Sequence, residues 1–235
     1  MCIANQTFGR RCFLLLLTAL AAPISVTPQA PSAPRFVVVL DAAHGGDDSG
    51  ARLGNQAEKD YTLALSVKLR SLLVARGITV VTTRESGADV DADRRTEIAN
   101  RANAAACLNL HAALASPKNG PAVHLFLSFL PHTTDARFVP WRTAQSAWTG
   151  RSDELARELK SALTHAGIAV TVGRTALPAI DSMACPAVAV EVAPQRRTDG
   201  TSADDAAFEA QVADALAAAL VEWRADIAQL GERRP

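Results

Sequence analysis

The fold is decided by the stretch Val37-Val38-Val39-Leu40-Asp41-Ala42-Ala43-His44-Gly45-Gly46. Its continuous run of valine and leucine predicts a strand that is buried on both faces, as strands of parallel sheets are. The two glycines let the backbone turn away sharply, so we expect His44 at the carboxyl end of that strand. Open α/β sheets carry their ligands and their chemistry at this edge, which makes His44 the first candidate for a functional residue.

Two later segments repeat this pattern of an apolar strand that ends in a functional side chain. Residues 106–110 lead into His111, and residues 186–190 lead into Glu191. Segments with helical spacing separate the predicted strands, and such alternation produces parallel strands whose carboxyl ends share one rim. We therefore expect His44, His111 and Glu191 to converge at one edge of an α/β sheet.

The other elements follow from periodicity and from capping residues. Further strands are predicted over 78–83, 123–130 and 169–172, and helices over 59–76, from Asp91 or Asp93 to Ala105, from Ser152 or Asp153 to Ala166, and over 203–230. The strand over 123–130 mixes polar with apolar residues, which favours a place near the sheet edge. Three histidines lack a strand-end position and are interpreted as surface residues: His124, His132 and His165.

Residues 131–150 have no clear period and contain two tryptophans, Trp141 and Trp148. We interpret this segment as a loop that lines or flanks the site. The tryptophans would then either anchor the loop by burial or stack on a ligand.

Length and composition are those of a single globular domain. The chain has 235 residues, of which 49% are hydrophobic and 20% are charged. That content supports one α/β domain with a sizeable core. Lys and Arg together number 24, as do Asp and Glu, so the formal net charge is zero. Without a basic field, we expect no nucleic-acid partner.

The amino terminus has the layout of an export signal. Arg10-Arg11 precede an apolar run over 13–22, and a proline-containing stretch of small residues follows. We interpret residues 1–33 as a signal peptide and linker, residues 34–230 as the catalytic domain and residues 231–235 as a tail. The apolar run is too short to span a bilayer, so we expect no integral membrane segment in the mature chain and a periplasmic or extracellular location. The paired arginines fit either a twin-arginine signal or an ordinary basic region.

Export would leave two cysteines, Cys107 and Cys185. The favoured interpretation treats both as small buried core residues. A disulfide is the alternative, since an oxidising compartment permits one.

The donor types at the predicted rim suit a transition-metal ion. Imidazole and carboxylate side chains bind Zn²⁺, and two histidines, one glutamate and a water form a common catalytic set. Besides Glu191, the chain offers Glu58 at the start of the first predicted helix. A glutamate there can also simply favour the helix amino terminus through the helix dipole.

The motifs together resemble the zinc-dependent N-acetylmuramoyl-L-alanine amidases of bacterial cell-wall metabolism, the amidase-3 type. The resemblance rests on Asp41 with His44-Gly45-Gly46, Glu58-Lys59-Asp60, Arg95 with Ala99-Asn100, Leu110-His111-Ala112 and Ala189-Val190-Glu191. It implies a single α/β domain with a mixed, mostly parallel six-stranded sheet flanked by helices on both faces.

The resemblance also implies the chemistry. One zinc ion per chain would be bound by residues that match His44, Glu58 and His111, and Glu191 would act as general base and acid. The substrate would be peptidoglycan, at the amide between N-acetylmuramic acid and L-alanine. Some relatives carry an inhibitory helix that an activator protein displaces; residues 131–151 are short for such an insertion, so we expect a more open site.

The chain departs from the family pattern in three places: Ala42-Ala43 stand where Pro-Gly is usual, Ala113 replaces an amide, and Val192-Ala193-Pro194 follow the glutamate. None of these changes removes a ligand. Two other functions stay open, a zinc amidohydrolase or peptidase that cuts a different amide, and an inactive cell-wall-binding or regulatory module.

Three interpretations of individual polar residues accompany the resemblance. Asp41 orients His44 or makes a loop hydrogen bond. Arg95 ties a helix to a neighbouring loop. Glu191, if it is not catalytic, pairs with Arg196 or Arg174.

Overall fold

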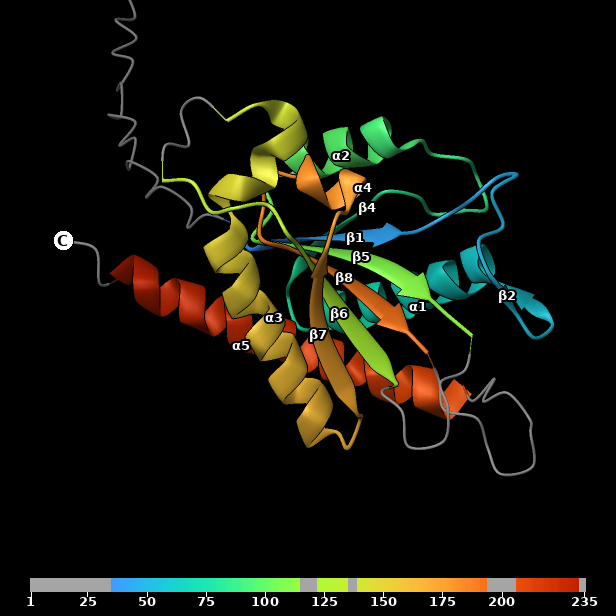
Figure 1. The fold of residues 1–235 in the computed structure, drawn as a ribbon. Helices are drawn as coiled ribbons and strands as arrows, with labels where there is room; N and C mark the ends of the chain where they lie inside the picture. The colour runs from blue at the N-terminus through green and yellow to red at the C-terminus, as the bar shows by residue number, and fades with distance from the viewer. Residues whose placement is uncertain (1–34, 115–121, 135–138, 194–205, 233–235) are drawn as a thin grey trace, which may run out of the picture. The chain divides into compact units, whose positions relative to one another are not determined.

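The computed structural model describes residues 35–114, 122–134, 139–193 and 206–232 (Figure 1). The expected signal peptide and linker at 1–33 lie outside the described residues. No helix within these ranges is long and apolar enough to cross a membrane.

The centre of the domain is a six-stranded sheet, counted over the described residues. Its order is β4 (Thr79–Thr82), β1 (Val37–Ala42), β5 (Ala106–Ala112), β8 (Ala187–Val192), β6 (Val123–Ser128) and β7 (Val170–Thr175). The first four strands are parallel to one another, whereas β6 pairs antiparallel with β8 and parallel with β7. The expected mixed, mostly parallel sheet is confirmed, and β6 is second from the edge.

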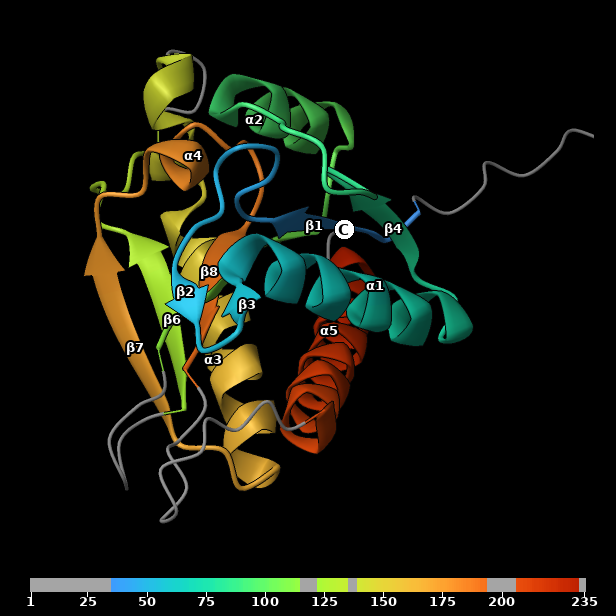
Figure 2. The ribbon, with the colours of Figure 1, turned by 90° about the vertical axis from the view of Figure 1, so that its right-hand side faces the viewer.

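Helices cover both faces of the sheet (Figure 2). One face packs on α1 (Glu58–Ala75), α3 (Thr149–His165) and α5 (Ala206–Glu232), and the other on α2 (Ala92–Arg101) and the short α4 (Pro178–Asp181). The side chain of Asp91 caps α2 by accepting a hydrogen bond from the backbone N–H of Arg94. A short hairpin of β2 (Arg52–Leu53) and β3 (Gln56–Ala57) precedes α1 and was not predicted.

The core lies mainly between the sheet and its three long helices. The run of apolar residues in β1 is buried along almost its whole length, as the sequence predicts for a central parallel strand. Fully buried leucines from the strands and helices meet there, among them Leu40, Leu65, Leu108, Leu159 and Leu216. A smaller cluster under α2 and α4 includes Val39, Ile180 and Met183.

The expectation for residues 131–150 is wrong in both form and place. The segment contains a 3₁₀ helix, η2 (Trp141–Ala147), whose buried Gln145 donates hydrogen bonds to the carbonyls of Met183 and Cys185, just before β8 begins. It therefore lies at the amino end of β8, away from the strand ends that carry the predicted site. The reason is that β6 runs antiparallel to β8, so the chain leaves β6 at the opposite rim.

Cys107 and Cys185 form a disulfide, with Cα atoms 6.3 Å apart. The favoured interpretation as two separate core residues is therefore wrong, although both are buried. Strand order explains the error: β5 and β8 are neighbours, with Cys107 opposite Ala187, but adjacent strands cannot be identified from sequence spacing alone.

Candidate metal centre

His44 lies just beyond the carboxyl end of β1 in a left-handed backbone conformation, with φ of +63°. That conformation is uncommon for a residue with a side chain, and surrounding contacts must hold it. The guanidinium of Arg95 donates hydrogen bonds to the carbonyls of Ala42 (2.6 Å) and His44 (2.6 Å). Thus Arg95 ties α2 to the loop that carries His44, as the sequence analysis expected.

A second buried arginine supports the same loop. Arg84 donates hydrogen bonds to the carbonyls of Ala42 (2.8 Å), Ala43 (3.0 Å) and Lys59 (2.7 Å). Burial lowers the pKa of Arg84, and the nearby charge of Arg95 lowers it further. The two guanidinium groups thus fix the backbone between β1 and His44 and link it to the start of α1.

Asp41 does not contact His44 through its side chain; it is the buried partner of Arg95, at 2.7 Å. The Asp41 carboxylate also accepts hydrogen bonds from Thr83 Oγ1 and Asn109 Nδ2, both at 2.6 Å. Of the two expected roles for Asp41, orientation of the His44 ring is wrong, whereas the alternative, a loop hydrogen bond, is confirmed by the bond from Thr83 in the loop after β4. Its role is indirect, because it neutralises the arginine that holds the His44 backbone.

Glu58 is the first residue of α1 and is buried. Its two carboxylate oxygens accept hydrogen bonds from the backbone N–H groups of Ala51 (2.9 Å) and Ala112 (3.0 Å). Burial alone would raise the pKa of Glu58, but the hydrogen bond from His111 and those two N–H groups outweigh it and lower the pKa to about 2. At neutral pH the side chain is an ionised carboxylate, the form that binds a metal ion.

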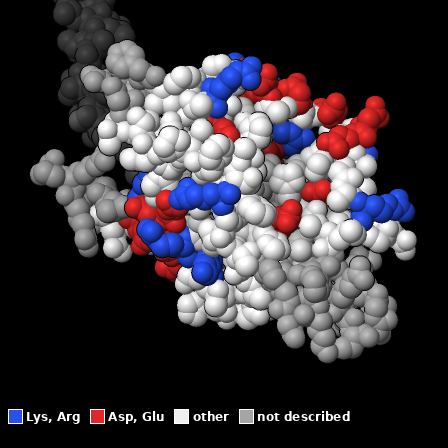
Figure 3. Space-filling view, viewed as in Figure 1, with Lys and Arg blue, Asp and Glu red and all other residues white. Residues whose placement is uncertain are grey.

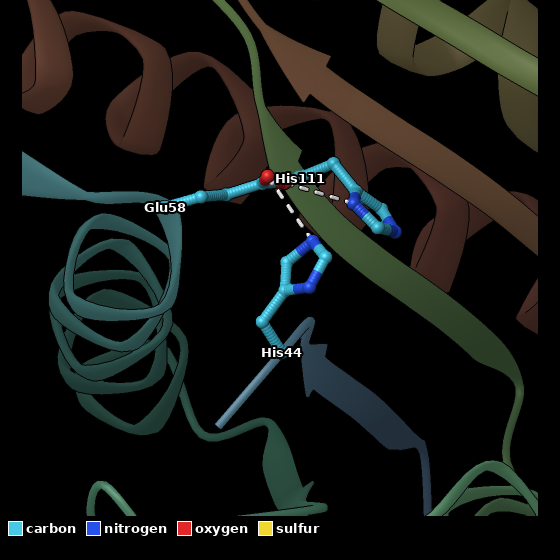
Figure 4. Close-up of side chains that lie close together, drawn as sticks. All are labelled: His44, Glu58 and His111. Atoms are coloured by element: carbon cyan, nitrogen blue, oxygen red, sulfur yellow. Dashed lines mark hydrogen bonds and ion pairs between the residues drawn. The ribbon is translucent and has the colours of Figure 1, made fainter. Parts of the chain in front are cut away.

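The structure brings together the three residues that the sequence analysis expects as ligands (Figure 4). His111 Nδ1 lies 3.0 Å from Glu58 Oε1, and His44 Nε2 lies 3.1 Å from Glu58 Oε2. One ligand atom from each residue lies within 4.8 Å of the other two. In a tetrahedral site with metal–ligand bonds of about 2.0–2.1 Å, ligand atoms are roughly 3.4 Å apart. The separations of 3.0 and 3.1 Å in this cluster are close to that value, so the three residues fit a zinc ion.

Position 50, in the loop beside the cluster, has no room for a side chain. A Cβ atom at Gly50 would lie 2.6 Å from His44 Cδ2 and 2.7 Å from Glu58 Oε2. Gly50 also has φ of +64°, a conformation that favours glycine. The loop between β1 and α1 can therefore pass directly over the ligands only because residue 50 is glycine.

Asp48 orients the ring of His44. Its Oδ2 lies 2.8 Å from His44 Nδ1, and the hydrogen bonds from His44 and from the Gly50 N–H lower the pKa of Asp48. An ionised carboxylate can only accept, so Nδ1 of His44 donates to Asp48, which leaves Nε2, the nitrogen nearest Glu58, as the atom that can face a metal ion. A histidine held in this way by a carboxylate is the usual arrangement in zinc sites.

Glu191 lies next to this cluster without belonging to it. It is the register partner of His111 on the adjacent parallel strand β8, so both side chains project from the same face of the sheet. The side chain is partly exposed, whereas its neighbours Val190 and Val192 are buried. A carboxylate beside a histidine of a candidate metal site is suited to moving protons there.

The structure shows no ion pair between Glu191 and Arg174, one of the two arginines expected to bind it if its role were only structural. Arg174 instead donates hydrogen bonds to the carbonyl of Ser128 and to Asp153, far along β7 from Glu191. Arg196 lies outside the described residues.

Asp48 and Arg84 support His44 but were not predicted from the sequence. A carboxylate four residues after His44, inside a glycine-rich loop, was a usable signal for a ring-orienting partner. Arg84 gave no such signal, because the hydrogen bonds by which it holds this loop are to backbone carbonyls of residues distant in the sequence.

Comparison with known proteins places these observations in a family. The Bacillus subtilis germination-specific N-acetylmuramoyl-L-alanine amidase is 43% identical over 54 residues, which is 23% of each chain. The Escherichia coli N-acetylmuramoyl-L-alanine amidase AmiA is 37% identical over 100 residues, covering 41% of this chain and 34% of AmiA. The matches thus span about a quarter to a third of the length of these relatives.

Solved structures share the fold over most of the chain. Ami1, the N-acetylmuramyl-L-alanine amidase of Mycobacterium smegmatis, has a TM-score of 0.66 at 20% identity and covers 81% of this chain and 97% of its own. The CwlD amidase of Clostridioides difficile, solved in complex with the GerS lipoprotein, has a TM-score of 0.63 at 20% identity and covers 81% of this chain and 99% of its own. The model of the Amidase_3 family, described as N-acetylmuramoyl-L-alanine amidase, matches residues 38–222. The chain therefore belongs to the Amidase_3 family.

Proposed function

We propose that the protein is an exported, zinc-dependent hydrolase that cleaves the amide between N-acetylmuramic acid and L-alanine in peptidoglycan. The observation that carries the proposal is the cluster of His44, Glu58 and His111 at the carboxyl ends of the parallel strands, with Glu191 in register beside it. Family membership supports the substrate class, since the family is described as N-acetylmuramoyl-L-alanine amidase.

The donor set fits one zinc ion per chain. Two imidazoles and one ionised carboxylate leave a fourth position for a water or substrate, as catalytic zinc sites do. Zinc, when bound, lowers the pKa of its water and polarises a carbonyl group. Asp48 and the two buried arginines keep His44 in place for that role.

Glu191 is assigned the proton transfers. As general base it accepts a proton from the attacking water, and as general acid it donates that proton to the departing amine of L-alanine. Its position one strand from His111, on the same sheet face, supports this assignment. The neighbouring valines keep the backbone of β8 buried, which fixes the point from which the carboxylate projects.

The cellular setting belongs to the same proposal. Residues 1–33 would direct export to the periplasm or the extracellular space, by the twin-arginine or the general route. Peptidoglycan would be the partner, and the CwlD relative solved with a lipoprotein gives a precedent for an additional protein partner.

Digestion of purified peptidoglycan sacculi tests the proposal. The mature protein, loaded with zinc and assayed for metal content, should release intact stem peptides with a free L-alanine amino group, identified by mass spectrometry. Fragments cut inside the stem peptide would indicate a peptidase on the same scaffold. Bound zinc without any product would indicate a binding or regulatory module.

A further inference from the structure

The sheet face that carries His111 and Glu191 continues as one row across two more strands. His111 on β5 is opposite Glu191 on β8, Glu191 is opposite His124 on β6, and His124 is opposite Thr171 on β7. Residues directly opposite one another on neighbouring strands project to the same face. His124 is therefore the next side chain beyond Glu191, on the side away from the metal ligands.

This part of the face is open over the described residues. Glu191 and His124 are partly exposed and Thr171 is exposed, whereas the neighbours that face the opposite way, Val123 and Leu125, are fully buried. Small acidic areas reach the surface near the carboxyl ends of β5 and β8, within largely uncharged surroundings (Figure 3). A substrate that reaches Glu191 would thus also meet the row beyond it.

His124 is held in a defined orientation. Its Nδ1 lies 2.7 Å from Thr171 Oγ1, and its ring is stacked on Phe126, with centroids 6.1 Å apart and planes 11° from parallel. Within the described part of the chain, no hydrogen bond involves Nε2. Nε2 is therefore available for a further hydrogen bond, on the residue directly opposite Glu191.

The proposed reaction indicates which part of the substrate lies near His124. A general acid must lie within hydrogen-bond reach of the nitrogen to which it donates, so the leaving amine passes close to Glu191. That amine is the amino terminus of the stem peptide. The peptide therefore extends over the Glu191 side of the metal ligands, where His124 comes next.

We propose that His124 is a substrate-positioning residue that hydrogen-bonds, through Nε2, a carbonyl or carboxylate oxygen of the stem peptide. The inference rests on the proposed amidase function and adds a residue that neither the zinc ligands nor the general base includes. Thr171 orients the ring and Phe126 supports its face, so both contribute through His124.

Kinetics with a soluble muramoyl-tetrapeptide test the proposal. His124→Ala should raise KM about tenfold, the value of one hydrogen bond of roughly 1.4 kcal/mol, and leave kcat within about threefold of wild type. His124→Gln, which keeps a polar donor and acceptor, should recover most of the loss. His132→Ala is the matched control, because His132 also pairs with a threonine, Thr149 at 3.1 Å, but lies near the start of α3.

Inhibition by the two products identifies which part of the substrate is bound. The inhibition constant of the free stem peptide should rise about tenfold in His124→Ala, whereas that of N-acetylmuramic acid should match wild type. A rise for N-acetylmuramic acid instead, a fall in kcat alone, or KM equal to wild type would each overturn the assignment. Failure of the proposed function looks different, because wild type would then not cleave the muramoyl-tetrapeptide.

Discussion

The two rims of the sheet use their polar groups in opposite ways. At the carboxyl ends of β1, β5 and β8, His44, His111 and Glu191 are partly exposed; His44 and His111 cluster with Glu58, and Glu191 is opposite His111. At the amino end of β8, buried Gln145 donates to two carbonyls and accepts from Ser152 Oγ. The first rim keeps polar atoms available for a ligand, and the second uses them within the protein.

The disulfide belongs with the second rim. Cys107 and Cys185 link the first half of β5 to the segment that leads into β8. Trp223 of α5 adds a hydrogen bond from its indole N–H to the carbonyl of Ala105, immediately before β5. The comparison teaches that one pair of neighbouring strands carries its crosslink near one end and its chemistry at the other.

The largest expected contrast between the rims is in activity. His111→Ala removes a proposed zinc ligand, so zinc content should fall well below one per chain. Hydrolysis of sacculi should drop more than ~100-fold, because losing a ligand costs more than losing a residue that only orients one. Trp141→Ala, at an exposed position of η2, should keep turnover within about twofold. Metal analysis and a dye-release assay measure both. Equal losses in the two variants would break the comparison.

The buried support of the first rim should contribute to stability as well. Arg95→Leu leaves Asp41 as an unpaired buried carboxylate and frees the His44 carbonyl, so the free energy of unfolding should fall by about 3–5 kcal/mol. Arg94→Leu, at an exposed neighbouring position, serves as the control and should stay close to wild type. Urea unfolding monitored by circular dichroism gives both values. A small loss in Arg95→Leu would show that the loop does not depend on this ion pair.

Removal of the disulfide should affect stability more than metal binding. The double variant Cys107→Ala/Cys185→Ala opens a crosslink between residues 78 positions apart, which should cost about 2–4 kcal/mol. Zinc stoichiometry should remain at one per chain, because the ligands lie at the other rim. Unfolding curves and metal analysis of the same samples decide the point. Loss of zinc with unchanged stability would contradict this prediction, because it would show that the disulfide supports the metal site and not the stability of the fold.

The smallest of these effects is a pH dependence of the metal-free protein. The pKa of Glu58 is lowered from 4.5 to about 2 on folding, so its ionised form stabilises the folded state above pH 4.5, and that contribution is lost as pH falls toward 2. After discounting for solvent screening, the contribution is about 2 kcal/mol. The stability difference between wild type and Glu58→Gln should therefore shrink over this pH range in urea titrations. A constant difference would contradict the assigned pKa.

The strands and the clustering of the three candidate ligands could be predicted from the sequence because their signals are local. The apolar run before His44, the strand ends at His111 and Glu191, and the helix start at Glu58 are each contained within a few residues. The resemblance to the amidases supplied the number of strands and the chemistry of these positions as expectations. The structure then brought the three ligand residues within reach of one another.

The failures concern relations between distant segments. The residues of β6 do not reveal whether this strand runs parallel or antiparallel to its neighbours. Residues 131–150, which follow β6, were therefore expected at the wrong edge of the sheet. The disulfide is possible because β5 and β8 are adjacent in the sheet, and strand order cannot be deduced from the two segments alone. For Asp41, orientation of the nearby His44 and a loop hydrogen bond were both expected, and neither expectation included Arg95, which is 54 residues away.

The central claim is that His44, Glu58 and His111 hold the metal while Glu191 moves the proton. Glu191→Gln tests this division most directly, with zinc content and turnover of a muramoyl-peptide measured on the same preparation. We predict close to one zinc per chain and a loss of turnover of about 10²–10⁴-fold, the usual contribution of a general base. Near-normal turnover, or loss of zinc together with activity, would contradict the account.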